Sequence, residues 1–141
     1  MKKNLLLIFI LILTFHVRLL DARDLKAAGP GDTLVVLWSS GDPDVAEKAC
    51  LMYAHAAKKN NWFKDVILIV WGPSEKLLAE NDGLKHKVAE MKKDGVRVQA
   101  CIACSNMYGV TDELKTCNVD VRGMGAPLSE YLKRGYRIVS F

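Results

Sequence analysis

The chain has 141 residues, half of them hydrophobic, and a formal net charge of +4 at neutral pH. This length and apolar content are enough for one domain whose core is stable without disulfide bonds, although the chain has four cysteines. Positive and negative charges nearly balance and no basic stripe alternates with aromatic residues, so nucleic acid is not an expected partner.

The first segment has the pattern of an export signal. Lys2 and Lys3 precede an unbroken apolar run over residues 5–15, which is shorter than the roughly 20 residues that span a bilayer. We therefore predict a signal peptide over residues 1–22, or an uncleaved membrane anchor in its place, and a periplasmic location. A short tether over residues 23–32 and one domain over residues 33–141 are expected to follow.

Five short segments predict β-strands. Residues 33–38 and 66–71 are continuously apolar, which is typical of strands buried on both faces of a parallel sheet. Residues 96–100 and 119–122 alternate between apolar and polar side chains, and we expect them to be less thoroughly covered. Residues 136–141 are expected to form the last strand.

Helical segments separate these strands. Asp42, Pro43 and Asp44 predict a helix start, and the helix is expected to run to about residue 59. Its expected buried stripe consists of Val45, Ala49, Met52, Tyr53 and Ala56.

A second helical region begins at Pro73 and is expected to break at residues 81–83 before it resumes over residues 84–93. Further short helices are predicted to begin near residues 111 and 126. Strands that alternate with helices favour an α/β fold of three layers, with helices on both faces of a doubly wound, mainly parallel five-stranded sheet.

Four of the loops that follow strands are expected at the carboxyl edge of the sheet, where ligands bind in α/β proteins. Glycines in three of these loops allow tight turns and the close approach of a ligand. The candidate binding residues in and around the loops are Trp38, Ser39, Ser40, Gly41, Trp71, Gly72, Ser105, Tyr108, Met124 and Gly125.

Cys101 and Cys104 stand where the third predicted strand gives way to a helix, and they are the candidate catalytic residues, Cys104 as an auxiliary. The positive end of a helix favours the reactive thiolate. Three chemistries fit the spacing: a dithiol–disulfide couple, a metal clip, or one reactive thiol at Cys101 that carries sulfur as a persulfide.

The positions of the remaining cysteines and histidines argue against a metal site and against a cysteine–histidine nucleophile. Cys50 and Cys117 are far from the pair in sequence, so no metal site is expected. Cys50 is expected to be a small buried residue, and Cys117 to pack near a helix end. Periodicity places His55 and His86 on helix surfaces, which leaves no histidine near the pair for a cysteine–histidine nucleophile.

The region from residue 33 to 141 resembles the DsrE/DsrF-like family of small sulfur-relay proteins. The resemblance rests on residues 35–42, 69–74, 95–101 and 124–125. It implies a doubly wound parallel sheet, a persulfide on the cysteine after the third strand, which corresponds to Cys101, and assembly into trimers or hexamers. Relay members typically have a single cysteine followed by a basic pair, whereas this chain has Cys104 and no basic residue in positions 105–109.

We therefore expect a thiol-based sulfur carrier in which Cys101 accepts and donates sulfane sulfur. The expected partners are sulfur donor and acceptor proteins or small sulfur species, and no cofactor is expected. A non-enzymatic binding module that uses the four loops, and a Cys101–Cys104 redox couple, are the alternatives.

Overall fold

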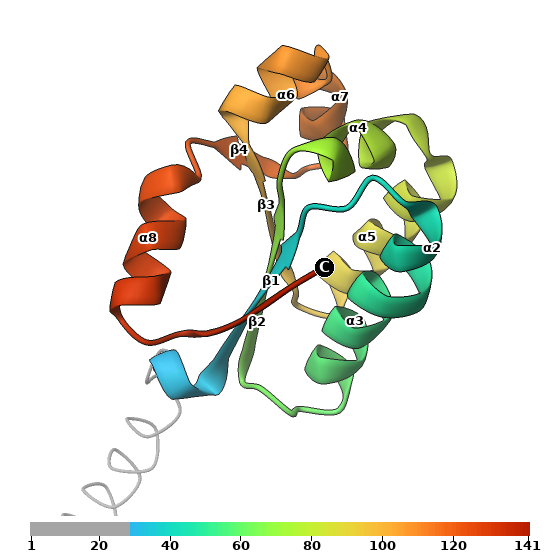
Figure 1. Ribbon diagram of the computed structural model, residues 1–141. Helices are drawn as coiled ribbons and strands as arrows, with labels where there is room; N and C mark the ends of the chain where they lie inside the picture. The colour runs from blue at the N-terminus through green and yellow to red at the C-terminus, as the bar shows by residue number, and fades with distance from the viewer. Residues whose placement is uncertain (1–28) are drawn as a thin grey trace, which may run out of the picture.

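The computed structural model describes residues 29–141, so the predicted signal segment and most of the predicted tether lie outside the described residues. Five parallel strands form one sheet in the order β4-β3-β2-β1-β5 (Figure 1). Every predicted strand is confirmed, with ends within one residue of the prediction. The strands are β1 (Thr33–Trp38), β2 (Asp65–Val70), β3 (Arg97–Cys101), β4 (Asp120–Arg122) and β5 (Arg137–Ser140).

Helices cover both faces of the sheet, which confirms the three-layer α/β prediction (Figure 1). None of the helices in the described part of the chain is long and apolar enough to span a membrane. The helical segments are η1 (Pro30–Asp32), α2 (Pro43–Val45), the π-turn η2 (Ala46–Cys50), α3 (Leu51–Lys59), α4 (Pro73–Glu80), α5 (Asp82–Lys93), α6 (Ile102–Tyr108), α7 (Thr111–Thr116) and α8 (Gly125–Lys133).

The two faces of the sheet are covered unequally, and the strand order explains why. From β1 to β4 each new strand is added on the same side of the last one, so right-handed crossovers place their helices on one face. Only after β4 does the chain return to the other side of β1, which puts α8 on the opposite face (Figure 1). The buried core on the α8 face is accordingly small: Val35, Ile67, Ile69, Cys101, Cys104 and Met124.

Strand burial follows the predicted pattern except in β3. The side chains of β1 and β2 are almost all buried, as their apolar sequences predict. In β3 only Arg97 is exposed, because β2 and β4 flank the strand and helices lie over both of its faces. The expectation of partial cover was therefore wrong for β3, whereas β4 at the edge is poorly covered.

The helix after β1 begins as predicted, but its buried stripe differs from the prediction. The Asp42 carboxylate accepts hydrogen bonds from the backbone N–H groups of Asp44 and Val45 and caps the helix. Apolar residues occupy nearly every position that follows, so periodicity alone did not identify the inward face, and the wide π-turn η2 changes its phase. The buried residues are Ala46, Cys50, Leu51, Ala54, His55 and Ala57, whereas Met52 is 57% exposed.

His55 is one of these buried residues, which corrects its predicted surface position. Its Nε2 atom lies 2.6 Å from Oδ2 of Asp94, at the end of α5. The neighbouring helix therefore covers the side chain that periodicity alone placed in solvent. His86 on α5 is exposed, as predicted.

The predicted break between α4 and α5 falls at Asn81, which caps α5. Asn81 Oδ1 accepts a hydrogen bond of 3.0 Å from the backbone N–H of Leu84. We expect Asn81→Ala to lower the free energy of unfolding by about 1 kcal/mol, because this N–H loses its acceptor. Urea unfolding measures the change, and Asn81→Asp, which keeps an acceptor, is expected to retain most of the stability. Equal stability of all three proteins would show that the cap is not stabilising.

Candidate functional site

Cys101 and Cys104 lie together at the carboxyl edge of the sheet. Cys101 ends β3 and occupies the N-cap position of α6, and Cys104 lies within the first turn of that helix. Only 5% of Cys101 and 9% of Cys104 is exposed, and both pack in the small core on the α8 face. Both cysteines are free thiols.

Hydrogen-bond donors surround the Cys101 sulfur. The backbone N–H groups of Ala103 and Cys104 belong to the first turn of α6, where such groups have no partner within the helix, and that of Met124 comes from the loop before α8. Burial raises the pKa of Cys101, but donation from these three N–H groups and from the Cys104 thiol outweighs it, so the net pKa lies below that of an ordinary thiol. The site therefore stabilises a Cys101 thiolate.

Cys104 has the opposite electrostatic environment. Burial raises the pKa of Cys104, donation from the Gly72 N–H lowers it, and the charges of Cys101 and Glu75 together with the hydrogen bond to Cys101 raise it further. The net pKa lies above the ordinary value. Cys104 thus stays protonated and donates its hydrogen to the Cys101 sulfur.

Glu75 is the residue of this site that the sequence reasoning missed. It lies in the first turn of α4 and is completely buried. Its Oε1 atom accepts a hydrogen bond of 3.0 Å from the backbone N–H of Cys101, while Oε2 has no hydrogen-bond partner. Burial raises the pKa of Glu75 to about 7, and hydrogen bonds from the N–H groups of Cys101 and Gly72 oppose the rise.

The loop before α4 holds Glu75 in this position. The Ser74 hydroxyl donates to the carbonyl oxygen of Trp38 at 2.6 Å and accepts from the backbone N–H of Trp71 at 3.0 Å, which ties the start of α4 to the ends of β1 and β2. Gly72 adopts a φ of +71°, a backbone conformation that residues other than glycine rarely adopt. The first-turn glutamate is thereby directed toward β3.

Four of the candidate binding residues lie close to the thiols. Met124 is buried with Cys101 and Cys104, and Trp71 is half-buried against the same cluster. The Gly72 N–H contacts the Cys104 sulfur. Ser105 is fully buried beside Cys104, and its hydroxyl donates to the carbonyl oxygen of Ile102.

The other candidate binding residues lie elsewhere along the edge. Trp38 is fully buried in the core on the opposite face. The backbone N–H groups of Ser39 and Ser40 both donate to the carbonyl oxygen of Phe141, beside β5. Gly41 and Tyr108 line a shallow pocket with Pro73, Lys76, Leu77 and Glu80, and Gly125 is exposed at the start of α8.

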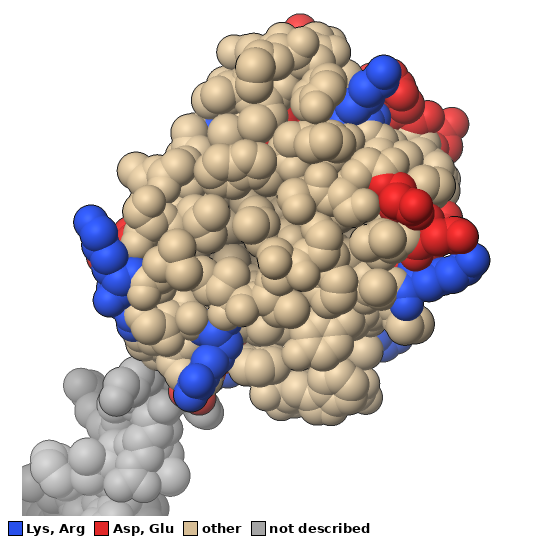
Figure 2. All heavy atoms as spheres, in the orientation of Figure 1, with Lys and Arg blue, Asp and Glu red and all other residues tan. Residues whose placement is uncertain are grey.

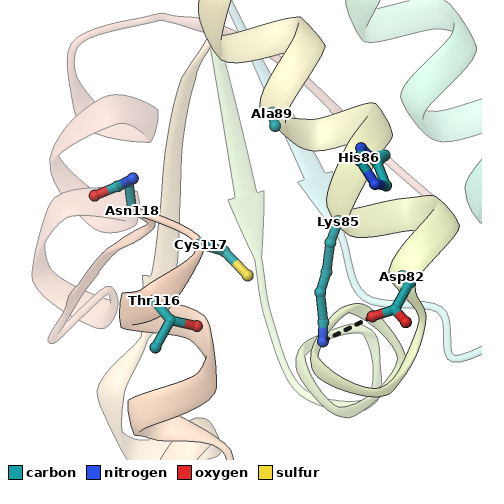
Figure 3. Close-up of a pocket in the computed structure, with 7 residues that line it drawn as sticks. All are labelled: Asp82, Lys85, His86, Ala89, Thr116, Cys117 and Asn118. Carbon is teal, nitrogen blue, oxygen red and sulfur yellow. Dashed lines mark hydrogen bonds and ion pairs between the residues drawn. The ribbon is translucent and has the colours of Figure 1, made fainter.

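A larger pocket of about 390 Å³ lies between α5 and the end of α7 (Figure 3). It contains none of the candidate site residues. Its Lys85 is held by Asp82 at 3.2 Å and by Glu113 at 2.5 Å, so this cation is already neutralised. The thiol site and this pocket are separate features.

The other two cysteines do not join the site. Cys50 is buried in the helical layer, as predicted, and burial raises its pKa to about 12, so this thiol is inert at neutral pH. Cys117 follows α7, is half-buried and lines the pocket of Figure 3. Within residues 29–141, no three His, Cys, Asp or Glu side chains form a group that could hold a metal ion.

Comparisons with known proteins agree with this architecture. The model of the DsrE/DsrF-like family matches residues 32–141. A solved structure of a conserved protein of unknown function, BT1422 from Bacteroides thetaiotaomicron, has a TM-score of 0.76 and 35% sequence identity, and the match covers 78% of this chain and 95% of that one.

The crystal structure of the ychN protein from E. coli has a TM-score of 0.58 and 14% identity, with 79% of this chain and 99% of that chain covered, which shows a shared fold. A search of the curated proteins finds no match.

Proposed function

Since the chain belongs to the DsrE/DsrF-like family, we propose that it is a sulfur carrier in which Cys101 holds sulfane sulfur as a persulfide. The observation that supports this most is the ring of donors around the Cys101 sulfur, contributed by Ala103, Cys104 and Met124. These donors stabilise the thiolate, which is the form that attacks sulfur.

The chemistry consists of two exchange steps. The Cys101 thiolate attacks a sulfane sulfur of the donor, the donor's S–S bond breaks, and the donor fragment leaves with the electron pair. An acceptor thiolate then attacks the outer sulfur of the persulfide, and Cys101 leaves as a thiolate. A low pKa helps both steps, because it ionises the attacking thiol and makes the same thiol a better leaving group.

We also propose that small sulfur species or proteins donate and accept this sulfur, and that the protein is periplasmic.

We further propose that the chain self-associates. β5 is an edge strand, and Leu132 of α8 is 60% exposed. Figure 2 shows few charged side chains in the middle of the face that carries the C-terminus. Such a surface suits a second copy of the chain, in line with the expected trimers or hexamers.

The test is to incubate the protein with sodium polysulfide and to map added sulfur by peptide mass spectrometry. We expect sulfur on Cys101 in the wild type and in Cys104→Ser, and complete loss of that label in Cys101→Ser. Cys50 provides an internal control, because its buried thiol is expected to stay unlabelled.

A wild-type protein that takes up no sulfur on Cys101 would contradict the carrier proposal. The Cys104 thiol contacts the Cys101 sulfur closely enough to donate a hydrogen bond, so the dithiol couple makes a different prediction. It predicts a reversible Cys101–Cys104 disulfide instead of a stable persulfide, and the same mass spectra distinguish the two.

A further inference from the structure

Two consecutive polar side chains at the start of α4, Ser74 and Glu75, lie fully inside the molecule. The Ser74 hydroxyl bonds to backbone groups at the ends of β1 and β2. Glu75 bonds to the end of β3, where its Oε1 atom accepts a hydrogen bond of 3.0 Å from the backbone N–H of Cys101. One turn of α4 therefore holds the carboxyl ends of three neighbouring strands.

The N–H of Cys101 depends on this acceptor because β2 has already ended. The last registered pair between β2 and β3 joins Val70 to Ala100, so Cys101 lies one residue beyond that pair. Cys101 is also the N-cap of α6, a position whose N–H has no acceptor within the helix. The Glu75 carboxylate, 26 positions away in sequence, supplies the acceptor in place of a strand.

The burial of Glu75 is not explained by α4 alone. Its Oε2 atom has no hydrogen-bond partner in the described part of the chain, and an unpartnered buried carboxylate oxygen is costly. An acid in the first turn stabilises a helix from an exposed position as well. Its contact with the end of β3 accounts for the buried position better than a role in α4.

The direction of the Cys101 N–H restricts where the sulfur of that residue lies. The peptide group is planar and its bond angles are nearly fixed, so an anchored N–H limits the path of the Cβ atom that carries the sulfur. Cys101 has extended backbone angles, with φ −85° and ψ 111°, at the point where the chain turns into α6. With these angles its side chain packs in the small core on the α8 face, together with Met124.

We propose that Glu75 is a positioning residue: it anchors the backbone of Cys101 and thereby holds the Cys101 sulfur among the N–H groups that stabilise its thiolate. The assignment deepens the proposed function and rests on it in one respect, namely that Cys101 is the reacting thiol. Without this anchor, the junction of β3 and α6 is free to rotate, and the sulfur loses its alignment with the donors.

Two variants without a charge at position 75 isolate the hydrogen bond. Glu75→Gln keeps an oxygen that accepts from the Cys101 N–H, whereas Glu75→Leu has no acceptor, so the comparison does not involve the carboxylate charge. The neighbouring titratable groups are the same in both variants: Cys104 on α6, and Arg122 on β4, whose Nε atom lies 3.1 Å from Oδ2 of Asp120. Alkylation of Cys101 by iodoacetamide is followed from about pH 5 to 10, and fragment mass spectra separate it from that of Cys104.

We expect the midpoint of Cys101 ionisation to lie about one pH unit higher in Glu75→Leu than in Glu75→Gln, because the thiolate loses well-aligned donors. Below both midpoints about ten times less thiolate would be present, and each thiolate would be roughly threefold more nucleophilic. Alkylation of Cys101 is therefore about threefold slower in Glu75→Leu. Glu80→Leu changes an exposed glutamate of the same helix and should keep the wild-type profile. Identical midpoints in Glu75→Gln and Glu75→Leu would overturn the assignment.

A measurement on the wild-type chain covers the case in which Glu75→Leu fails to fold. The Glu75 carboxyl carbon and the Cys101 amide and β-carbon are followed by NMR as the pH rises. A carboxylate accepts a stronger hydrogen bond than a neutral carboxyl group, so we expect both Cys101 signals to show a step at the Glu75 midpoint, besides the step from ionisation of Cys101 itself. A Glu75 titration without a step at the Cys101 β-carbon would overturn the assignment. Neither experiment adds sulfur, so its failure is distinct from failure of the carrier proposal.

Discussion

Between about pH 5 and pH 7.5, the wild-type protein is expected to lose about 2 kcal/mol of its free energy of unfolding through Glu75 alone. The reason is the difference between the pKa of Glu75 in the folded chain, about 7, and its ordinary value of 4.5. Each pKa unit of difference corresponds to about 1.4 kcal/mol, so the whole shift corresponds to about 3 kcal/mol, of which about 2 kcal/mol falls between pH 5 and pH 7.5.

The sign follows from which state holds the proton more tightly. The unfolded chain releases the Glu75 proton as the pH rises past 4.5, whereas the folded chain keeps it until about 7. Between these values the folded state binds more protons, so a rise in pH favours unfolding. The stabilising contribution is complete below the unfolded pKa and is lost as the pH passes the folded one.

Urea unfolding at a series of pH values, followed by tryptophan fluorescence, measures this dependence. Glu75→Gln is expected to remove most of the slope and to be more stable than the wild type at about pH 7.5. Glu80→Gln is the matched control and should retain the wild-type slope, since Glu80 is exposed. An unchanged slope in Glu75→Gln would show that this carboxyl does not titrate in the window.

The window is chosen to separate Glu75 from other shifted groups. The hydrogen bond from His55 lowers the pKa of Asp94. The stabilising contribution of Asp94 is therefore lost only as the pH falls below 3.8, outside the chosen window. Burial raises the pKa of the Cys101 thiol, but the donors around its sulfur outweigh burial and lower the net pKa below the ordinary value, so the effect of Cys101 on stability has the opposite sign to that of Glu75.

The strands were predictable because their signal is local. Residues 33–38 and 66–71 form continuous apolar runs bounded by turn residues, and such runs have few alternatives to a buried parallel strand. Cys101 was predictable for the same reason, since its place at the end of a strand follows from the strand itself. The cap residues Asp42 and Asn81 also acted through neighbours a few positions away.

Glu75 and His55 could not be predicted because distant parts of the chain bury them. In sequence, Glu75 is an ordinary first-turn acid after Pro73, and only the approach of β3 and its N–H group places that acid inside the molecule. The burial of His55 depends on Asp94, which lies 39 positions away. A single sequence contains no signal for such contacts.

The burial of Met124 also could not be predicted from the sequence. It was a candidate binding residue in a glycine-flanked loop, yet its side chain is fully buried. The strand order explains this position: among the helices between α2 and α8 in the described part of the chain, only α8 covers this face of the sheet, so the residue before α8 fills the space over Cys101 and Cys104. Met124 therefore combines two roles, packing with its side chain and donation to the Cys101 sulfur with its N–H.

We expect Met124→Ala to lower the free energy of unfolding by about 2–5 kcal/mol, the range for truncation of a large buried side chain. The α8 face has few other buried side chains that could fill the cavity, which favours the upper part of that range. Because the lost side chain packs against the cluster that holds Cys101, we also expect Cys101 to be alkylated faster. Urea unfolding and peptide mass spectrometry measure the two effects on the same samples.

Met107 provides the matched control, because it is a methionine of the neighbouring α6 that is 77% exposed. Met107→Ala is expected to change stability by no more than about 0.5 kcal/mol. Met124→Leu, which conserves volume, should cost less than about 1.5 kcal/mol and restore slow alkylation of Cys101. If Met124→Ala is as stable as Met107→Ala, the cluster around Met124 does not hold α8 on the sheet. If Cys101 alkylation also stays slow, groups other than the Met124 side chain control access to the thiol.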